Sequence, residues 1–483
     1  MNRKMVVFSV GEIVIIEAIL LLLPLTVSVI YGERTAIFGF GVTAVAAALL
    51  GVFLVLLGRT KNRIIYSKEG FVIVAFSWVL LSLIGAVPFV LSGDIPFYID
   101  AVFETVSGLT TTGSSILTNV EALSHGALFW RSFTHWVGGM GVLVFIMALV
   151  PNVSDRSIHI IRAEMPGPIV GKLVPKVKNT AKILYLIYVV LTLVQVVFLL
   201  FGGMTLFEAF VHAFGTAGTG GFAIKANGLA GYSPYIQWVI TIFMALFGLN
   251  FNLFYLLILG KVGSVLRNRE MWAYILLLLT ATGLITVNIY NMYGGFEEAL
   301  RMSAFQVSSI VTTTGYSTCD FNLWPPFSKA ILFILMFIGG CAGSTAGGLK
   351  VSRAMLLFKM AKNEFLHLIH PRSVSVVKLE GKQVEGPVLH SASNYFTLYI
   401  ACMAAVYLLI SLFDPFDMET NLTATVTCFN NVGPGLGSIV GPAGSFASYT
   451  PYSKIVLSLA MLFGRLEILP MMIAFIPATW TKR

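Results

Sequence analysis

The sequence predicts an all-α polytopic membrane protein. Four pseudo-symmetric repeats, each a span, a short pore helix and a second span, surround a central pore, and an N-terminal helix pair lies outside them. Hydrophobic residues make up 57% of the chain and charged residues only 11%, whereas a soluble globular protein carries roughly 25% charge. A short half-apolar segment followed by a glycine-bearing loop recurs four times between long apolar segments. Such internal repetition indicates a repeated architecture.

Ten apolar segments reach the roughly 20 residues that a membrane-spanning helix needs. The first is too long for the apolar part of a signal peptide and lacks a small-residue cleavage site, so it is interpreted as a span. An even number of spans puts both termini on the same side of the membrane. The segments cover 6–30, 36–57, 70–92, 127–150, 182–203, 235–260, 271–293, 328–349, 394–413 and 453–477.

The basic residues orient the chain. If the N-terminus is cytoplasmic, most of the 31 Lys and Arg residues fall in cytoplasmic segments, chiefly 151–182 and 350–390, in agreement with the positive-inside rule. We therefore predict a multi-pass protein of the cytoplasmic membrane with both termini inside, and we attribute the net charge of +9 to topology rather than to nucleic-acid binding. Acidic residues gather on the outer side, where they suit helix N-termini and a vestibule that concentrates cations.

Four shorter segments, at 98–109, 206–217, 297–311 and 418–429, are too short to cross the bilayer and too apolar for surface loops. Because such segments are tolerated in a membrane only where protein or a water-filled cavity covers them, we expect re-entrant helices. A glycine-bearing loop follows each one. The candidate filter residues in these loops are Thr110, Thr111, Thr112, Gly113, Gly218, Thr219, Gly220, Gly221, Thr312, Thr313, Thr314, Gly315, Asn430, Asn431, Val432 and Gly433.

The chemistry of these loops suits a dehydrated monovalent cation. A bare ion in hydrocarbon costs on the order of tens of kcal/mol, and rings of backbone carbonyls replace its water shell in cation filters. Glycine reaches positive φ at little steric cost, and the C-terminal end of each short helix carries partial negative charge. The neighbouring threonines can offer hydroxyls or fix the backbone. Since the four loops are not identical in sequence, we expect weaker discrimination between cations than in a long symmetric filter.

Six motifs spread over essentially the whole chain form a specific set: TTTGSS (110–115), GTAGTGGFA (215–223), TTTGYST (312–318), NNVGPGLGS (430–438), GGCAGSTAGGLK (339–350) and GRLEI (464–468). Together they resemble the Trk/Ktr/HKT superfamily of potassium transporters, and most closely its TrkH-type membrane subunit. The resemblance implies K⁺ uptake through a four-repeat pore, a homodimer, and a cytosolic nucleotide-binding regulatory subunit of the TrkA/KtrA type. It implies no covalent cofactor, and any nucleotide would act only through that partner.

The resemblance assigns the filter role to Gly113, Gly315 and Gly433 with the residues that precede them. In the second loop the register stays open, because the spacing from Phe210 favours Gly220 whereas the Gly-Phe pair favours Gly221. The expected domains are an N-terminal transmembrane helix pair at 1–60, pore repeat 1 at 61–155, pore repeat 2 at 156–262, pore repeat 3 with an intramembrane gating loop at 263–385, and pore repeat 4 at 386–483.

A glycine-rich stretch interrupts the eighth span and does not favour a helix, since each glycine costs up to about 1 kcal/mol relative to alanine. Close helix packing is one interpretation. The favoured one, supported by the resemblance, is a flexible loop that obstructs the pore below the filter. Its candidate residues are Gly339, Gly340, Gly343, Ser344, Thr345, Gly347 and Gly348. Lys350 follows, and snorkelling to the cytoplasmic surface explains its charge.

Arg465 lies within the tenth apolar segment. A central arginine costs at least about 2.5–3.5 kcal/mol to insert, and Glu467 lies on a different helix face. A structural ion pair with some other acid is one interpretation. The favoured one, as the resemblance implies, is an electrostatic barrier in the pore. Glu12 and Glu17 in the first span fit helix contacts better than a proton pathway.

Several other functions compete with a K⁺ transporter. A Na⁺-permeable or Na⁺/H⁺-coupled member of the superfamily, or the channel subunit of a K⁺-pumping ATPase, would use similar loops. The coupling of transport to another ion, as in a symporter, is not readable from the sequence. A membrane enzyme is disfavoured, because the sequence shows no nucleophile–base pair, metal-ligand spacing or phosphate-binding loop. A purely structural role is disfavoured by the four pore-like loops.

Overall fold

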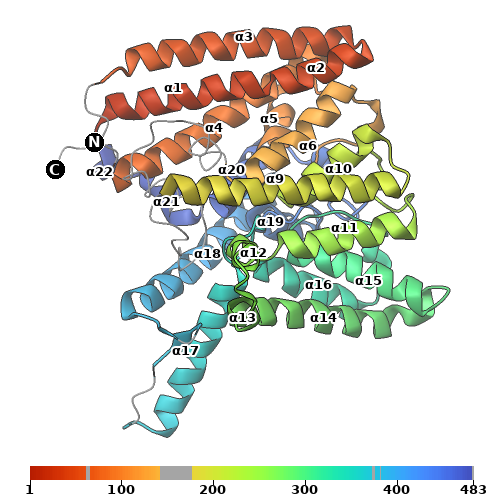
Figure 1. Ribbon diagram of the computed structural model, residues 1–483, viewed down its shortest axis with the longest axis vertical. Coiled ribbons are helices and arrows are strands. Elements are labelled where there is room, and N and C mark those ends of the chain that lie inside the picture. Colours follow the sequence, from red (N-terminus) through yellow and green to blue (C-terminus); the bar gives the residue numbers. More distant parts are fainter. Residues whose placement is uncertain (61–65, 142–176, 373–375, 381, 481–483) are drawn as a thin grey trace.

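The computed structural model describes the whole chain except residues 61–65, 142–176, 373–375, 381 and 481–483. The described part is helical apart from one two-stranded hairpin (Figure 1). Six described helices are long and apolar enough to cross a membrane, and there are up to eight spans if each of two bent helix pairs counts as one. The predicted all-α polytopic fold is therefore confirmed.

The N-terminal helix pair packs closely through glycines. The first span consists of α1 (Arg3–Leu20) and α2 (Leu22–Tyr31), and α3 (Arg34–Leu57) follows. A Cβ added to Gly11 would lie 2.7 Å from a backbone nitrogen of α3, and one added to Gly51 would lie 2.9 Å from a backbone nitrogen of α1. Small residues allow two helix backbones to approach this closely. The pair covers one side of the first repeat, because α1 and α3 both contact α4.

The predicted repeats are present as four helix triplets. In each triplet a long first helix is followed by a short helix and then by a second span. The triplets are α4 (Ser67–Ser92), α5 (Tyr98–Leu109) and α6 (His125–Gly139); α9 (Val177–Phe201), α10 (Leu206–Gly218) and α11 (Pro234–Phe247); α14 (Arg269–Ile289), α15 (Phe296–Val311) and α16 (Pro326–Ile338); and α18 (Gly386–Phe413), α19 (Met418–Asn430) and α20 (Pro451–Arg465).

The repeats close into a ring because each short helix lies between two second spans. Each of α5, α10, α15 and α19 contacts the second span of its own repeat. Each of α10, α15 and α19 also contacts the second span of the preceding repeat, namely α6, α11 and α16. The contact between α5 and α20 joins the first repeat to the fourth. The boundary at 155/156 falls outside the described residues, so the domain bounds stay predictions.

Two spans predicted as single helices are broken. The segment 235–260 consists of α11 and α12 (Phe251–Ile258), bent by 91°, and the segment 453–477 consists of α20 and α21 (Ile468–Phe475), bent by 119°. The side chain of Asn250 accepts a hydrogen bond from the Asn252 amide at 2.9 Å and so starts a new helix after the first break. Each bent pair is, taken together, apolar enough to count as one span, so hydropathy averaged over a span did not reveal the breaks. The end of the predicted span 127–150 lies outside the described residues.

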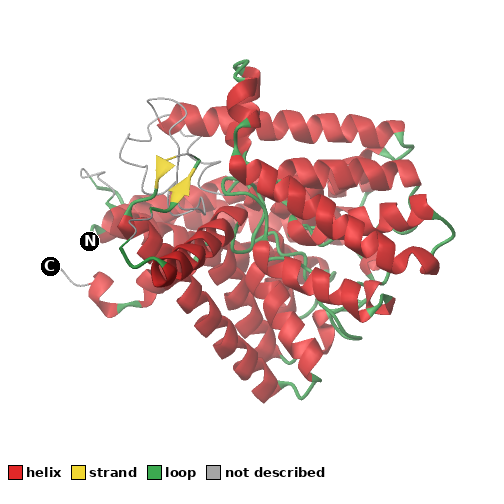
Figure 2. Ribbon diagram, turned by 90° about the horizontal axis from the view of Figure 1, so that it is seen from below, coloured by secondary structure: helices red, strands yellow, loops and turns green. Residues whose placement is uncertain are grey.

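The remaining elements are short or lie at one end of the molecule. In Figure 1, α17 (Val351–Ile369) projects from the body, and Figure 2 shows the hairpin of β1 (Lys378–Leu379) and β2 (Lys382–Gln383) in yellow. The two strands pair antiparallel. The other short elements are η1 (Val120–Ala122), α13 (Val262–Leu266), η3 (Tyr290–Met292), η4 (Phe321–Leu323), η5 (Phe446–Ser448) and α22 (Pro477–Trp480).

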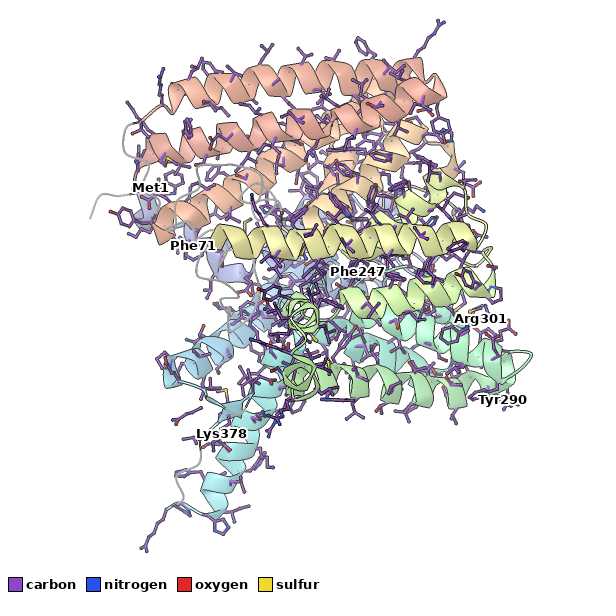
Figure 3. The ribbon with its side chains drawn as sticks, in the orientation of Figure 1. Met1, Phe71, Phe247, Tyr290, Arg301 and Lys378 are labelled. Atoms are coloured by element: carbon purple, nitrogen blue, oxygen red, sulfur yellow. The ribbon has the colours of Figure 1, made fainter. Side chains whose placement is uncertain are left out.

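The two ends of the described chain meet on one side. The Arg3 guanidinium donates a hydrogen bond to the backbone carbonyl of Trp480 at 3.2 Å. Figure 3 places Met1 and Lys378 at one end of the molecule and Tyr290 at the opposite end. This agrees with an even number of spans, while the assignment of that side to the cytoplasm stays a prediction.

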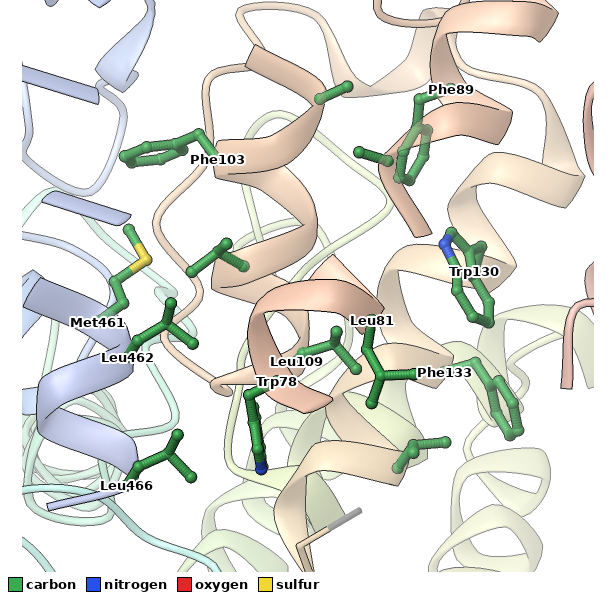
Figure 4. Close-up of a cluster of buried hydrophobic side chains, with 14 of the residues drawn as sticks. Trp78, Leu81, Phe89, Phe103, Leu109, Trp130, Phe133, Met461, Leu462 and Leu466 are labelled. Atoms are coloured by element: carbon green, nitrogen blue, oxygen red, sulfur yellow. The ribbon is translucent and has the colours of Figure 1, made fainter. Parts of the chain in front are cut away.

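A hydrophobic core joins the N-terminal repeat to the last one. Figure 4 shows Trp78 and Leu81 of α4 beside Leu109 of α5 and Phe133 of α6, with Leu462 of α20 facing them. All five side chains are buried. Burial of a side chain of this size contributes roughly 1.5–3 kcal/mol, so this core fixes the ring at the point where the chain closes on itself.

A buried ion pair holds α5 against α6. The Arg131 guanidinium contacts the Glu104 carboxylate at 2.7 Å, and their side chains are 2% and 0% exposed. The carboxylate also accepts hydrogen bonds from the hydroxyl of Ser115 and from the amide of Ile116. The pair therefore ties the short helix, the second span and the segment after the first loop together.

We predict that Glu104→Ala destabilises the protein by about 3–5 kcal/mol, because it leaves a buried arginine without its charge partner. The measurement is the thermal unfolding midpoint of the purified protein in detergent. Glu297→Ala is the matched control. Glu297 pairs with the buried Arg301 at 3.1 Å but is itself 63% exposed, and Arg301 keeps a hydrogen bond to the side chain of Gln237. Because the Glu297 carboxylate is solvated, we expect its loss to cost at most about 1 kcal/mol. Equal shifts in the two variants would contradict the structural role of the buried pair.

Candidate functional site

The four loops after the short helices begin with the same backbone turn. Each short helix ends where an amide N–H bonds to the carbonyl five residues earlier, a Schellman-type ending. The residue before that amide is left-handed, although such a conformation costs a residue with a side chain about 1–2 kcal/mol. The left-handed residues, with φ of 55–57°, are Thr111, Thr219, Thr313 and Asn431. The bonds, all 2.8–2.9 Å, run from Thr112 to Ser107, Gly220 to Gly215, Thr314 to Ser309 and Val432 to Thr427.

Two positions after each left-handed residue comes a glycine with positive φ. The four glycines are Gly113, Gly221, Gly315 and Gly433. The open register of the second loop is thereby settled geometrically, since Gly221 and not Gly220 matches the other three.

The spacing from Phe210 pointed to Gly220 because it treated Phe210 as the equivalent of Phe103 and Phe305. In the structure, Phe210 does not occupy the equivalent position in the second short helix. Val211 stands as far from its loop as Phe103 and Phe305 stand from theirs. These three side chains are fully buried, whereas that of Phe210 is only partly buried. Burial in the fold, which the sequence alone did not reveal, identifies the anchor.

The loops meet one another in chain order around a closed ring. A Cβ added to three of the glycines would lie 2.0–2.4 Å from a carbonyl oxygen of the next loop, closer than real side chains approach, and one added to Gly433 would lie 3.0 Å from such an oxygen, which is a tight contact. The pairs of glycine and facing carbonyl are Gly113 with Gly220, Gly221 with Thr314, Gly315 with Val432, and Gly433 with Thr112. Both the positive φ and this contact require glycine. One carbonyl oxygen per loop therefore recurs at the same position of the ring.

The residues beside the glycines fix the backbone of the loops. The hydroxyls of Thr110 and Thr112 are hydrogen-bonded at 2.8 Å, and those of Thr312 and Thr314 at 2.7 Å. In the fourth loop, the Tyr399 hydroxyl donates to the side-chain oxygen of Asn430 at 2.6 Å. The hydroxyls of Thr110 and Thr312 also donate to the carbonyls of Val106 and Ser308, at 2.7 Å each, and so support the backbone.

A cavity of about 370 Å³ lies on the side of the ring away from the glycine-rich segment, and all four ring glycines line it. The lining includes the cations Arg131 and Lys225, and no carboxylate belongs to the described residues that line it. The expected acidic vestibule is therefore not observed at the ring itself. Several outer acids instead support the starts of helices: Asp94 binds Ser124, Glu208 binds Thr205, Asp414 binds Thr450 and Asp417 binds Thr420.

The candidate gating residues lie on the other side of the ring, in the non-helical segment between α16 and α17. The Gly347 amide donates a hydrogen bond to the Thr313 hydroxyl at 2.6 Å, and a Cβ at Gly347 would lie 2.5 Å from the carbonyl oxygen of Asn430. The segment thus touches the third and fourth loops from below. It is also held at the α11–α12 break, where the Cys341 amide donates to the Gly248 carbonyl at 2.9 Å.

Arg465 joins this segment to the first repeat. Its guanidinium donates to the carbonyl of Thr345 at 2.8 Å and to those of Gly138 and Gly139 at 2.6 Å each. The last two belong to the end of α6. Glu467 pairs instead with Arg353 at 2.5 Å. The arginine and the glycine-rich segment, predicted separately, are therefore in contact.

The prediction that Lys350 snorkels is wrong. Its side chain is buried, and its ammonium group donates a hydrogen bond to the carbonyl of Ala346 within the same glycine-rich segment. A carbonyl inside the segment replaces the water that snorkelling would reach.

Sequence reasoning missed Glu270, which binds the glycine-rich segment, and Glu380, which binds the start of α14. The Glu270 carboxylate accepts a hydrogen bond from the Ala342 amide at 2.7 Å. The Glu380 carboxylate, between β1 and β2, accepts hydrogen bonds from the amides of Arg269 and Glu270 at 3.0–3.2 Å. Only the position of Glu270 at the start of a span hinted at a role. Glu17 is buried in α1, and its Oε2 has no hydrogen-bond partner among the described residues.

The fold and the site define a class: a polytopic membrane protein whose four repeats bring their short helices and loops together in one pore-loop ring. Within the described ranges, His, Cys, Asp and Glu side chains form no group of three or more that could hold a metal ion.

Comparison with known proteins identifies the family within this class. The family model TrkH, described as a cation transport protein, matches residues 40–482. The Trk system potassium uptake proteins TrkH of Salmonella typhimurium and Escherichia coli strain K12 are 37% and 36% identical to the chain over 100% of both sequences. The crystal structure of the potassium transporter TrkH from Vibrio parahaemolyticus aligns over 100% of both chains with a TM-score of 0.88 and 29% identity. The chain belongs to the TrkH family.

We predict that Glu270→Ala loosens the gating segment and raises the thiol-labelling rate of Cys341 about tenfold. Cys341 is buried in this segment, and loss of a hydrogen bond to a charged acceptor costs about 1.5–3 kcal/mol. The rate is measured with a membrane-permeant maleimide after the more accessible Cys319 and Cys402 are replaced by serine. The buried Cys428 serves as the internal control, because its rate should stay unchanged. An unaltered Cys341 rate would contradict the assigned role of Glu270.

Proposed function

We propose that this protein takes up K⁺ across the cytoplasmic membrane through a channel-like pore whose filter is the ring of four loops. The observation that carries the proposal is the ring itself: four carbonyl oxygens, one from each loop, recur at one position beside four glycines. The names of the most similar relatives, which are potassium uptake proteins, support K⁺ as the transported ion. The fold of a transporter family also favours transport over an enzymatic role.

The chemistry of the proposed filter is the replacement of water by backbone oxygen. The carbonyls of Thr112, Gly220, Thr314 and Val432 act as ligands of the dehydrated ion. The four short helices end at these loops, and their partially negative C-terminal ends favour a cation there. No side-chain charge is needed. The driving force is the membrane potential, worth about 2.3 kcal/mol per charge per 100 mV.

The proposed gate is the glycine-rich segment below the ring, with Arg465 as an electrostatic barrier. Two observations support this role. The segment touches Thr313 directly under the filter, and Arg465 bridges the segment to α6 through three carbonyls. Opening would require the arginine to leave these carbonyls and the segment to withdraw.

Partners form part of the proposal. The chain would act as a homodimer with a cytosolic, nucleotide-binding TrkA/KtrA-like subunit, for which α17 projects beyond the body (Figure 1). Coupling to H⁺ or Na⁺, a Na⁺-permeable pore and the channel subunit of a K⁺-pumping ATPase remain the alternatives. Rb⁺ and Na⁺ fluxes in proteoliposomes, with and without an imposed ion gradient, distinguish among them.

We predict that Gly315→Ala lowers the preference for Rb⁺ over Na⁺ at least tenfold, because a Cβ would collide with the Val432 carbonyl and displace one ligand of the ring. The measurement is the ratio of the two fluxes in proteoliposomes that hold equal amounts of folded protein. Gly283→Ala in α14, where an added Cβ meets no atom within 4 Å, is the matched control. An unchanged ratio in Gly315→Ala would reject the filter assignment.

We predict that Arg465→Ala raises the K⁺ flux about tenfold, which corresponds to removal of a barrier of about 1.4 kcal/mol. Arg465→Lys should give an intermediate flux, because it keeps the charge but cannot span three carbonyls. The flux is measured per folded molecule in proteoliposomes. A flux in Arg465→Ala equal to that of the unaltered protein, at normal expression, would contradict the proposed role of Arg465 as an electrostatic barrier.

A further inference from the structure

The second loop lacks the pair of threonines that supports the first and third loops. At the positions of Thr110 and Thr112, and of Thr312 and Thr314, the second loop carries Gly218 and Gly220. Neither glycine has a positive φ. Backbone conformation therefore does not require glycine at either position, and another cause must be sought.

The imidazole ring of His135 fills the space where a side chain at position 220 would stand. A Cβ added to Gly220 would lie 2.2–2.5 Å from three atoms of this ring. His135 comes from α6, the second span of the first repeat. Glycine at position 220 thus leaves room for the imidazole of His135, a residue that is far away in the sequence.

Both nitrogens of His135 are hydrogen-bonded to backbone groups near the ring of loops. Nε2 accepts from the Phe222 amide at 3.3 Å, so it carries the lone pair and Nδ1 carries the proton. Nδ1 then donates to the Gly108 carbonyl in α5 at 2.8 Å. The imidazole also packs against the Phe222 ring, with centroids 4.3 Å apart. The side chain is fully buried.

We propose that His135 is the positioning residue of the second filter loop and thereby determines ion preference. This inference rests on the proposed K⁺ filter. In the first and third loops, a hydroxyl pair supports the residue before the ring glycine. In the second loop, His135 packs against Gly220 and binds the amide just after Gly221. It therefore fixes the Gly220 carbonyl, which faces Gly113 of the first loop, in the ring.

If His135 positions the second loop, the effects of substitutions at His135 and Gly220 depend on each other. A histidine with only a general structural role would not produce this dependence. If the imidazole is what excludes a side chain at 220, its removal must make room for one. The same removal cannot make room at Gly221, because a Cβ there meets the Thr314 carbonyl and the backbone has a φ of 70°. These two glycines, adjacent in the chain, provide a matched pair for a double-mutant cycle.

The experiment compares the ratio of Rb⁺ to Na⁺ flux in proteoliposomes for His135→Ala, Gly220→Ala and the double variant, each corrected for folded protein. We expect each single substitution to lower the ratio at least tenfold. The double variant should recover at least threefold over Gly220→Ala, whereas Gly221→Ala with His135→Ala should show no recovery over Gly221→Ala. Strictly additive losses in the Gly220 cycle would overturn the proposal.

Conservative variants separate positioning from folding. His135→Gln can donate to the Gly108 carbonyl and accept from the Phe222 amide, so it should retain more of the ratio than His135→Ala even if the alanine variant is poorly folded. His212→Gln removes another buried histidine, whose Nδ1 bonds to the Glu208 carbonyl, and should leave the ratio unchanged. A normal ratio in His135→Gln and His135→Ala beside an altered one in Gly315→Ala would reject this inference alone. Normal ratios in all three would reject the filter itself.

Discussion

The close approach of each ring glycine to a carbonyl oxygen of the next loop is the constraint on which the rest of the structure depends. Such contacts leave no room for a side chain at three of the four glycines and little room at Gly433, and a left-handed residue with a side chain stands two positions before each glycine. Strained conformations persist only where the surroundings over-determine them. Here each short helix lies between two second spans, and hydrogen bonds to the backbone five residues back close each turn. The packing of the spans thus holds the loops in a conformation that they would not adopt alone.

Below the ring, the glycine-rich segment is held almost entirely through its backbone. Thr313, Glu270 and Arg465 each bind a main-chain amide or carbonyl of this segment. Irregular backbone within a membrane needs such partners because no water is available to satisfy it. Since the partners come from the third and fourth repeats, and Arg465 also binds the end of α6, the position of the segment depends on several repeats at once. A shift of one repeat against another would change its hydrogen bonds.

The sequence predicted what depends on local pattern and missed what depends on contact between repeats. The short helix expected at 98–109 is α5 at Tyr98–Leu109, because apolar content and length mark it. The ring glycines were found from repetition of the motif. The breaks after α11 and α20, the burial of Lys350 and the match of Gly221 with the other ring glycines were not readable, because carbonyls and side chains from other repeats decide them. His135, which packs against Gly220, is the clearest case, because no residue near the second loop in the sequence indicates this contact.

The contact between α5 and α20 also governs when the ring of loops can form. Synthesis runs from the N-terminus, so the first three repeats enter the membrane before α20 exists. Until then α5 lacks one of its two neighbours, and the hydrogen bond from Asn431 to the Thr112 hydroxyl at 2.8 Å cannot form. Insertion of the spans and completion of the ring of loops are therefore separate events in biogenesis. The ring is complete only at the end of translation, when the last repeat contacts the first.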